Sequence, residues 1–487
     1  MPTANPRALL RRLLAGSDEG PWLEFKHNNE DCDMIGRTLS ACANAAMLAD
    51  RDRAFIVWGI RDGTREKVGT SVRLQRLKKG GENLQNWLSR MIEPKLLLEC
   101  FDFSDDGLDF SILAVEPTYD RPVRFAGSEY IRIGENVKPL KDFPEHERAL
   151  WLATGRRKFE DAIALPNQTA LDVLNLLNAE TYYNLKSEPV PRNKTEILKR
   201  FSQLGFVVDD MEDGYHITNL GALLFANDIS TFPSIATKSV RVIKYSGTNK
   251  MKSESETEGV KGYAVGFRPM LKFIMDRLPK EERFTGGVRK ALSVYSETAL
   301  REMVANALIH QDFTMSGSGP VVEIYKDRIE ITNPGNSLIA VDRIIDERRS
   351  RNEKFAAAMR EVGLCEERGG GIDKSIIEIE EMALPAPEFF PSENSMRVVL
   401  FGPKKFANLS KADRVWSCFC HCVVRWLAHD YMNNTSLRAR FSLGDEDYQV
   451  VSSVIADAKK AGRIAPADKN QGNKYAKYIP FWAVSDD

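Results

Sequence analysis

The chain has 487 residues, with 68 Lys and Arg against 69 Asp and Glu, so its net charge is −1. This length exceeds what one hydrophobic core normally serves, and about three domains are expected. The balanced charge excludes a uniformly basic nucleic-acid-binding protein, so any nucleic-acid surface must be local. No stretch is apolar for the length of a membrane span, and the N-terminal residues lack the apolar core of a secretory signal. Seven cysteines argue against a disulfide scaffold, and a cytoplasmic protein with reduced thiols is expected.

The first expected domain, residues 1–155, contains a short stretch of alternating polarity. Leu23 and Phe25 alternate with Glu24 and Lys26, which predicts a strand that hides the apolar pair and presents Glu24 beside Lys26 on the other face. Two interpretations stay open for the charged pair. It is either a solvated ion pair or part of a site.

A helix and a buried strand are expected next. The run DCDMIGRTLSACANAAMLAD shows helical spacing of its apolar residues, with Asp31 or Asp33 as the N-cap. The run AFIVWGI is apolar throughout and stops before a turn at Asp62 and Gly63. This pattern predicts a buried central strand with Asp62 where the strand surfaces.

Acidic side chains that converge at a strand end repel each other unless a cation joins them. If Asp62 meets other carboxylates such as Glu24, the oxygens would suit Mg²⁺ or Mn²⁺. Such a metal polarises a phosphodiester and activates water, and Lys26 would offset charge on the phosphate. The simpler interpretation is that Asp62 is an ordinary turn residue.

The first domain resembles the Alba-like domain of Schlafen proteins. The resemblance rests on E-x-x-x-x-E-F-K, the helix with SACANAA, the strand that leads to WGIRDG, and the later run EYIRIGENVKPL. It implies an α/β domain that binds nucleic acid, and a metal-dependent nuclease site formed by Glu19, Glu24 and Asp62. The chain departs from the family after the helix, where ANAAMLADRDRA replaces the usual glycine turn.

Arginines of this domain are candidates for a surface that binds the nucleic-acid backbone. For each of them taken singly, a solvated protein face is the simpler interpretation. The candidates are Arg51, Arg53, Arg121, Arg124 and Arg132.

The second expected domain, residues 160–405, opens with helix, hairpin and helix signals, for which we prefer a connecting or winged-helix-like scaffold. Further along, Glu302, Asn306 and His310 are spaced four residues apart and fall on one face of a predicted helix. A carboxylate one turn before an amide suits a site in which the first orients water and the second completes the oxygen shell of a metal.

A hairpin and a glycine run follow that helix. VVEIYKDRIEITNPG predicts two strands joined at Lys326 and ending at Gly335. Gly369, Gly370 and Gly371 directly precede another predicted helix, where backbone N–H groups can approach phosphates closely.

This order of motifs resembles the GHKL ATP-binding fold of gyrase, heat-shock chaperones, histidine kinases and MutL, in the divergent form attached to RecG-related proteins. The resemblance implies an α/β sandwich that binds ATP with Mg²⁺. It makes Glu302 the general base, Asn306 a magnesium ligand, Asn333 and Gly335 the adenine-side loop, and RGGGI the phosphate loop. The broader fold has an aspartate where this chain has Asn333, so weaker nucleotide binding is expected. No G-x-x-x-x-G-K-[ST] motif is present, which excludes a P-loop motor.

The third expected domain, residues 408–487, begins with the apolar helix VWSCFCHCVVRWLA. Its Cys418, Cys420, His421 and Cys422 lie within one helix rather than in pairs separated by loops. We therefore reject a zinc site and expect these cysteines in the core.

Two further helices and a hairpin predict a C-terminal winged helix-turn-helix. Its second helix would turn Lys459 and Lys460 outward toward DNA. Winged helices also serve as dimerisation elements, and a homo-oligomer, a dimer or higher, is expected for this protein.

The sequence thus predicts an α+β multidomain protein, and three functions stay open. The first is an ATP-responsive, metal-dependent nuclease that acts on RNA, including tRNA, or DNA; the resemblance to Schlafen proteins points to anti-phage defence. The second is a transcriptional regulator that binds DNA without cleavage and is switched by nucleotide. The third is a structural assembly protein with a vestigial nucleotide site.

Overall fold

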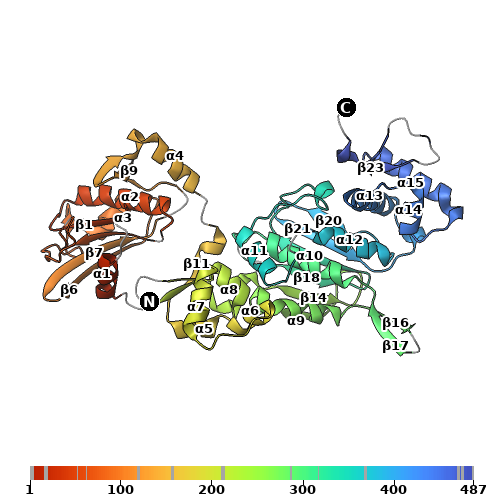
Figure 1. Ribbon diagram of the computed structural model, residues 1–487, viewed down its shortest axis with the longest axis horizontal. Coiled ribbons are helices and arrows are strands. Elements are labelled where there is room, and N and C mark those ends of the chain that lie inside the picture. Colours follow the sequence, from red (N-terminus) through yellow and green to blue (C-terminus); the bar gives the residue numbers. More distant parts are fainter. Residues whose placement is uncertain are drawn as a thin grey trace. The chain divides into compact units, whose positions relative to one another are not determined.

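The structure is a computed structural model of the 487-residue chain. It forms two compact units, Met1–Lys158 with Asp209–Tyr215, and Phe159–Val208 with His216–Asp487 (Figure 1). The second and third expected domains both lie in the second unit. The structure describes residues 5–15, 20–51, 53–61, 63–117, 121–154, 158–209, 214–285, 288–315, 317, 319–366, 370–468, 472 and 476–484.

The first unit is built on a four-stranded sheet in the order β1-β2-β7-β6. β1 and β2 are parallel, and the other neighbours are antiparallel. Every residue of β2 is buried, as its continuous apolar run predicts for a central strand. The strands are Leu23–Lys26 (β1), Ala54–Trp58 (β2), Leu98–Asp105 (β6) and Leu108–Val115 (β7).

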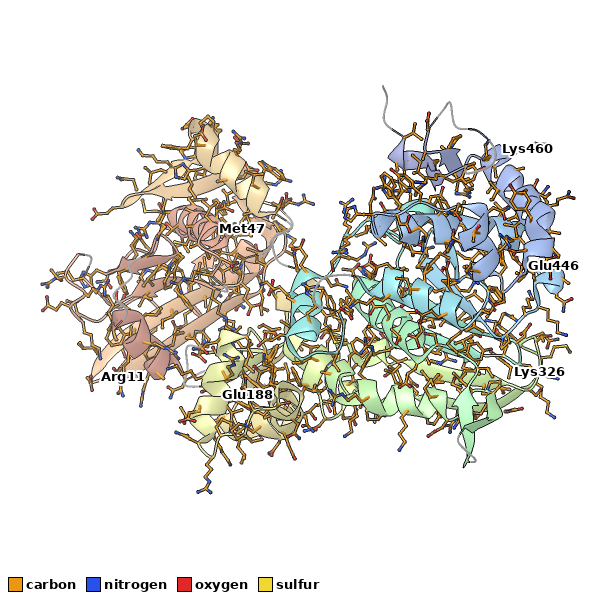
Figure 2. All side chains as sticks on the ribbon, turned by 45° about the vertical axis from the view of Figure 1, so that its right-hand side comes forward. Arg11, Met47, Glu188, Lys326, Glu446 and Lys460 are labelled. Carbon is orange, nitrogen blue, oxygen red and sulfur yellow. The ribbon has the colours of Figure 1, made fainter. Side chains whose placement is uncertain are left out.

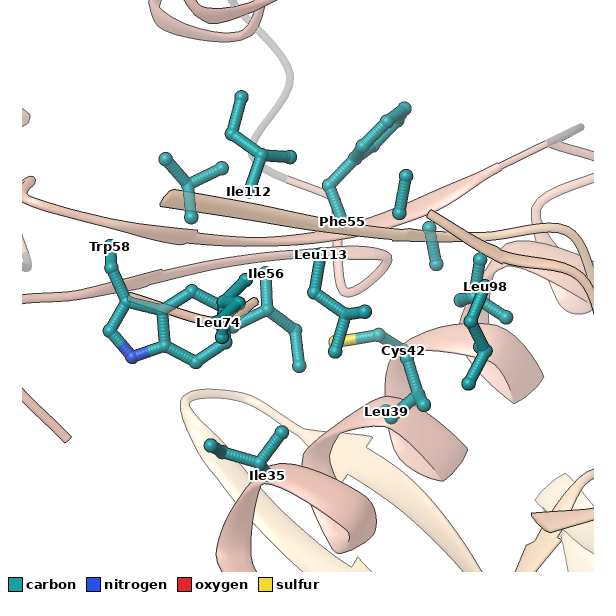
Figure 3. Packing of buried hydrophobic residues seen from close by; sticks show 14 of the residues in the cluster. Ile35, Leu39, Cys42, Phe55, Ile56, Trp58, Leu74, Leu98, Ile112 and Leu113 are labelled. Carbon is teal, nitrogen blue, oxygen red and sulfur yellow. The ribbon is translucent and has the colours of Figure 1, made fainter. Parts of the chain in front are cut away.

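Helix α2 (Cys32–Leu48) covers one face of this sheet. The helix begins at Asp31, whose side chain accepts hydrogen bonds from two backbone N–H groups of the first turn. Residues at helical spacing face the sheet, whereas Phe55 and Ile112 lie on its opposite face (Figure 3). The contact in Figure 3 joins Ile35, Leu39 and Cys42 of α2 to Ile56 and Leu113 of the sheet.

A buried asparagine of α2 anchors a second sheet, which has the order β10-β9-β8-β5. The Asn44 side chain donates to the carbonyl oxygens of Val123 and Tyr130, at 2.8 Å each, and accepts from Val123 N at 2.7 Å. These bonds satisfy a side chain that is fully enclosed. The remaining elements of the unit are α1 (Pro6–Ala15), β3 (Lys78–Lys79), β4 (Glu82–Asn83), α3 (Leu84–Met91), β5 (Ile92–Glu93), β8 (Arg124–Phe125), β9 (Ser128–Ile133), β10 (Asn136–Pro139) and α4 (Pro144–Ala153).

The second unit begins with a small three-stranded sheet and its helices, which include the predicted helix, hairpin and helix at residues 194–225. Aromatic rings form its core, among them Tyr182, Phe201 and Phe225. The sheet order is β11-β13-β12. The elements are β11 (Ile163–Gln168), α5 (Ala170–Leu176), α6 (Ala179–Lys186), α7 (Lys194–Gln203), β12 (Val207–Asp209), β13 (Tyr215–Thr218) and α8 (Asn219–Phe225).

A six-stranded sheet in the order β15-β14-β18-β19-β21-β20 follows, and α10 (Glu297–His310) contacts β19 and β21 (Figure 1). α10 also packs against α12 (Gly371–Glu381). The predicted hairpin is β18 with β19, and Lys326 marks its turn (Figure 2). The other elements are β14 (Arg241–Tyr245), β15 (Ser253–Glu258), α9 (Tyr263–Met275), β16 (Lys280–Thr285), β17 (Val288–Ser293), β18 (Val321–Ile324), β19 (Arg328–Pro334), α11 (Glu353–Glu361), β20 (Glu388–Pro391) and β21 (Ser395–Phe401).

The C-terminal region has the expected three helices and hairpin. Its cysteines at 418, 420 and 422 are buried in α13, as the apolar helix predicts. They share one core with Ile345 and with Ile376 of α12. The elements are α13 (Lys411–Leu427), α14 (Asn434–Arg440), α15 (Tyr448–Lys460), β22 (Ile464–Pro466) and β23 (Tyr478–Pro480). Short 3-10 helices lie at Leu140–Asp142, Phe159–Asp161, Ile229–Thr231, Ala236–Lys238, Val341–Arg343, Phe406–Asn408, Asp445–Asp447 and Phe481–Ala483.

A buried charged cluster joins the end of α12 to this region. Glu380 Oε2 lies 2.7 Å from His421 Nδ1, and Glu380 Oε1 lies 3.2 Å from Arg440 Nε. Ser436 Oγ lies 3.1 Å from His421 Nε2. Arg440 also donates to the carbonyl oxygen of Leu384 at 2.8 Å, so side chains from α12, α13 and α14 meet in one network.

Among the helices that the structure describes, none combines the length and apolar character needed to cross a bilayer.

Candidate functional site

A cavity of about 230 Å³ lies beside α10 in the second unit. Its walls come from α10, the end of β19, the loop after β19, and the segment between α11 and α12. Ligand pockets usually measure about 300 to 1,000 Å³, so this one is small but of the right order. The sequence-predicted residues that line it are Glu302, Asn306, His310 and Asn333.

Helix α10 places its predicted polar residues on the cavity side. Ser296 caps the helix by accepting a hydrogen bond from Ala299 N at 2.9 Å, and the apolar face of the helix is buried. Asn306 Nδ2 donates to Glu302 Oε1 at 3.3 Å. Because this bond uses the amide N–H, the amide oxygen of Asn306 is left to accept a hydrogen bond or to bind a metal.

Glu302 is a buried acid with an unsatisfied oxygen. The residue is 6% exposed, and its Oε2 has no hydrogen-bond partner in the part of the chain that the structure describes. Burial, partly offset by Arg301, raises the pKa of Glu302. A Cβ built on Gly371 would lie 2.0 Å from Glu302 Oε1, so only glycine leaves room for this carboxylate at the start of α12. An orphaned buried oxygen beside this glycine fits a site for a nucleotide with its cation.

We expect Glu302→Gln to stabilise the protein, and to do so more at pH 8 than at pH 5. The pKa of this carboxyl is higher in the folded state than in the unfolded state. The buried negative charge therefore lowers the free energy of unfolding fully above the folded-state pKa, and not at all below the unfolded-state pKa. Glutamine removes the charge at every pH. Thermal unfolding at both pH values checks this, with the exposed Glu381→Gln as the control. An equal shift at both pH values would contradict it.

The loop at the end of β19 is fixed against the residue that follows α10. Asn333 is buried and donates from Nδ2 to Pro334 O at 3.1 Å, which leaves its amide oxygen as an acceptor. Gly335 has φ +98°, and a Cβ there would lie 2.8 Å from Asp312 Cβ. The left-handed backbone and the close contact both require glycine at this position.

The predicted phosphate loop is described in part. Gly370 is the N-cap of α12 and Gly371 its first residue, whereas Gly369 lies outside the described residues. Among the described residues, which exclude 367–369, no side chain caps this N-terminus. The first N–H groups of α12 are therefore available to an anion.

Several cavity residues are not predicted from the sequence. Arg351, which follows the cavity-lining Ser350, donates to Asp312 Oδ2 at 3.3 Å and to Asn336 Oδ1 at 2.9 Å, which ties the loop after β19 to the end of α10. Arg348 and Arg349 line the cavity. The arginine-rich run ERRSR was the signal that could have found them. His310 lines the cavity, and burial lowers its pKa to about 4, so the ring is neutral at pH 7.

Glu24, one of the three acids of the expected nuclease site, is already paired with two cationic side chains. Glu24 in β1 is 6% exposed, and its two oxygens form ion pairs with Lys26 and with Arg132 of β9. The pair with Lys26 is as predicted, but Glu24 is buried rather than solvated because Arg132 covers it. Arg132 also donates to Leu23 O at 2.8 Å.

The other two acids of the expected nuclease site, Glu19 and Asp62, lie outside the described residues. Within the described ranges, no group of three or more His, Cys, Asp or Glu side chains is placed to hold a metal. A metal at Glu24 would have to displace one of its two cations, so Glu24 on its own does not fit an open metal site.

The arginines proposed for nucleic-acid contacts have different surroundings. Arg132 forms an ion pair with Glu24 and its side chain is 10% exposed, so little of it is open to a nucleic acid. Arg53 pairs with Glu99 and Glu116, and Arg124 pairs with Glu93. Arg51 lies over the Trp22 ring at 5.3 Å, and Arg121 is exposed.

The two C-terminal lysines, Lys459 and Lys460, are exposed at the end of α15. The start of the same helix directly follows the acidic run Asp445–Asp447. Figure 2 shows Glu446 of this run and Lys460 in the C-terminal region. The acids would repel DNA phosphates from the N-terminal end of α15, where a recognition helix normally contacts bases.

Two family models match this chain. Residues 19–141 match the model described as Schlafen, AlbA_2, and residues 317–400 match the model described as putative ATP-dependent DNA helicase recG C-terminal. The chain joins a Schlafen AlbA_2 domain to a RecG-like HATPase domain. The resemblances to a Schlafen Alba-like domain and to a RecG-related ATP-binding domain are thereby confirmed. The AlbA_2 domain contains Glu24, and the HATPase domain contains Asn333 and Gly371, whereas Glu302 and Asn306 precede the matched range.

No curated protein matches the chain. Among solved structures, the DIP2311 protein from Corynebacterium diphtheriae aligns with 98% of this chain and 97% of its own, at 14% sequence identity and a TM-score of 0.42.

Proposed function

We propose that this protein binds ATP in the cavity of its HATPase domain and binds nucleic acid through its AlbA_2 domain. The observation that carries the first part is the convergence of Glu302, Asn306, Asn333 and the uncapped N-terminus of α12 on one cavity. Isothermal titration of ATP into the wild-type protein tests the proposal, and absence of binding would contradict it.

The chemistry of these side chains supports distinct roles. Mg²⁺ supplied with the nucleotide would neutralise phosphate charge, and the amide oxygen of Asn306 would be its ligand from this chain. Glu302, buried and with a raised pKa, would hold and orient water and accept its proton. The N–H groups at the start of α12 would receive phosphate oxygens. The amide oxygen of Asn333 would accept a hydrogen bond from the exocyclic amine of adenine.

A metal-dependent nuclease is the finer proposal for the AlbA_2 domain, acting on RNA, including tRNA, or on DNA. It is supported by the position of Glu19, Glu24 and Asp62, all of which fall inside the Schlafen AlbA_2 match. Lys26, paired with Glu24 and partly exposed, would be placed to meet a phosphate.

Glu24→Gln is expected to abolish cleavage of labelled tRNA or single-stranded DNA in Mn²⁺, because the amide cannot supply the negative charge that a metal site needs. The change keeps the shape of a buried side chain. Gel analysis of product against time measures the effect. Glu116→Gln, which removes an exposed partner of Arg53, is the control and should cleave like wild type. Equal cleavage by wild type and Glu24→Gln would contradict the proposed site.

A second candidate function is a DNA-binding regulator that does not cleave and is switched by nucleotide. The observation that favours it is the pairing of both Glu24 oxygens with cations, which leaves no open position for a metal. The same assay separates the two functions. Sequence-selective binding to duplex DNA that persists as salt is raised, with no product, would support the regulator, since nonspecific binding falls steeply with salt.

A further inference from the structure

The cavity is also lined by the guanidinium group of Arg360, to which none of the roles above is assigned. Arg360 lies in the last turn of α11, is half-buried, and lines the same cavity as Glu302 and Asn306. Among the residues that the structure describes, no carboxylate forms an ion pair with Arg360. A half-buried guanidinium without an acidic partner is costly unless an anion joins it.

Arg360 shares a neighbour in the cavity wall with Glu302. Cys365 is buried in the cavity wall, and burial raises the pKa of its thiol to about 11. Glu302 raises this pKa further, whereas Arg360 lowers it. Arg360, Glu302 and Cys365 therefore share one cavity wall, and both charges act on the same thiol.

The cavity needs positive charge if it is to receive phosphates. Glu302 is negative when ionised, and Asp373 in the first turn of α12 adds negative charge near it. Two further acids line the cavity and are already paired, Glu366 with Lys374 at 2.8 Å and Glu347 with Arg343 at 3.0 Å. Arg348 and Arg349 are more exposed than Arg360, so water screens their charges more strongly. A guanidinium suits the task because its planar fork can donate to two phosphate oxygens at once.

We infer that Arg360 contacts the phosphate groups of the bound nucleotide and gives the site its preference for a triphosphate over a nucleoside. This inference rests on the proposed ATP binding. A plainer role is available, since a cation in the last turn of a helix also stabilises the helix dipole. That role would not distinguish ATP from adenosine.

The test compares wild type, Arg360→Ala and Arg360→Lys in calorimetric titrations with ATP and with adenosine, in the presence of Mg²⁺. Loss of charge-assisted hydrogen bonds should weaken ATP binding by Arg360→Ala about 10- to 100-fold and leave adenosine affinity unchanged. Arg360→Lys, which keeps the charge without the fork, should fall between the two. Arg192→Ala, an exposed arginine outside the cavity, is the matched control.

The outcomes separate the inference from the function on which it depends. Wild type that does not bind ATP overturns the proposed function and the inference with it. Wild-type affinity in Arg360→Ala overturns the inference alone, as does an equal loss of ATP and adenosine affinity. Melting temperatures of the variants show whether the fold is kept, and a retained adenosine affinity shows that the cavity is intact.

Discussion

Asn306→Ala is expected to lower the affinity for Mg²⁺–ATP by at least about tenfold, the usual scale for removing a group that orders a metal site. The substitution removes the amide oxygen that faces the cavity, and with it the donor 3.3 Å from Glu302 Oε1. Glu302 is then buried without a hydrogen bond on either oxygen, since its Oε2 already lacks a partner within the described ranges. The loss should therefore affect metal and phosphate binding together.

Calorimetric titration of ATP with and without Mg²⁺ measures this effect. In wild type, chelation of the metal should weaken binding, whereas in Asn306→Ala the metal should make little further difference. Asn175→Ala, which alters an exposed asparagine of α5, is the matched control and should bind like wild type. A variant that keeps both its affinity and its dependence on Mg²⁺ would remove Asn306 from the site.

Arg440→Ala is expected to lower the free energy of unfolding of the second unit by about 3 to 5 kcal/mol. The Arg440 side chain is 3% exposed and pairs with Glu380, which His421 contacts from α13. Without Arg440, the carboxylate of Glu380, whose side chain is 13% exposed, loses one of its two cationic or hydrogen-bonding partners. The carbonyl oxygen of Leu384 loses its donor as well.

Urea unfolding followed by circular dichroism measures the loss. Arg425→Ala, which breaks the exposed pair with Asp430, should cost no more than about 1 kcal/mol. The double variant Glu380→Met with Arg440→Met should cost less than Arg440→Ala, because no unpaired charge is left in the core. If Arg440→Ala costs as little as Arg425→Ala, the cluster does not stabilise the fold.

The order and spacing of apolar residues predicted the individual strands and helices. The apolar run of β2, the helical spacing of α2 and α10, and the cysteine-rich helix α13 each appear where the sequence placed them. The continuous apolar run of β2 predicts a strand buried on both faces, and in the helices the period of the apolar residues shows which side is buried. The glycines of the two cavity loops were predicted for the same reason, since their backbone requirements are local.

Pairings between distant segments were not predictable from such patterns. Glu24 and Lys26 are two residues apart and were expected together, whereas Arg132, which buries Glu24, comes from a strand more than a hundred residues later in the sequence. Arg360 likewise enters the cavity from a helix to which the sequence assigned no role. Charged side chains at long separation meet only through tertiary packing, and periodicity says nothing about which of them meet.

Helix α12 is about 16 Å long, and its two ends make different contacts. Gly371 makes room for Glu302 at one end, and Glu380 is locked to α13 and α14 at the other. The C-terminal helices also share their core with Ile376, in the middle of α12. Removing them would expose that core and leave Glu380 without its partners, so the HATPase domain and the C-terminal region should melt as one cooperative body.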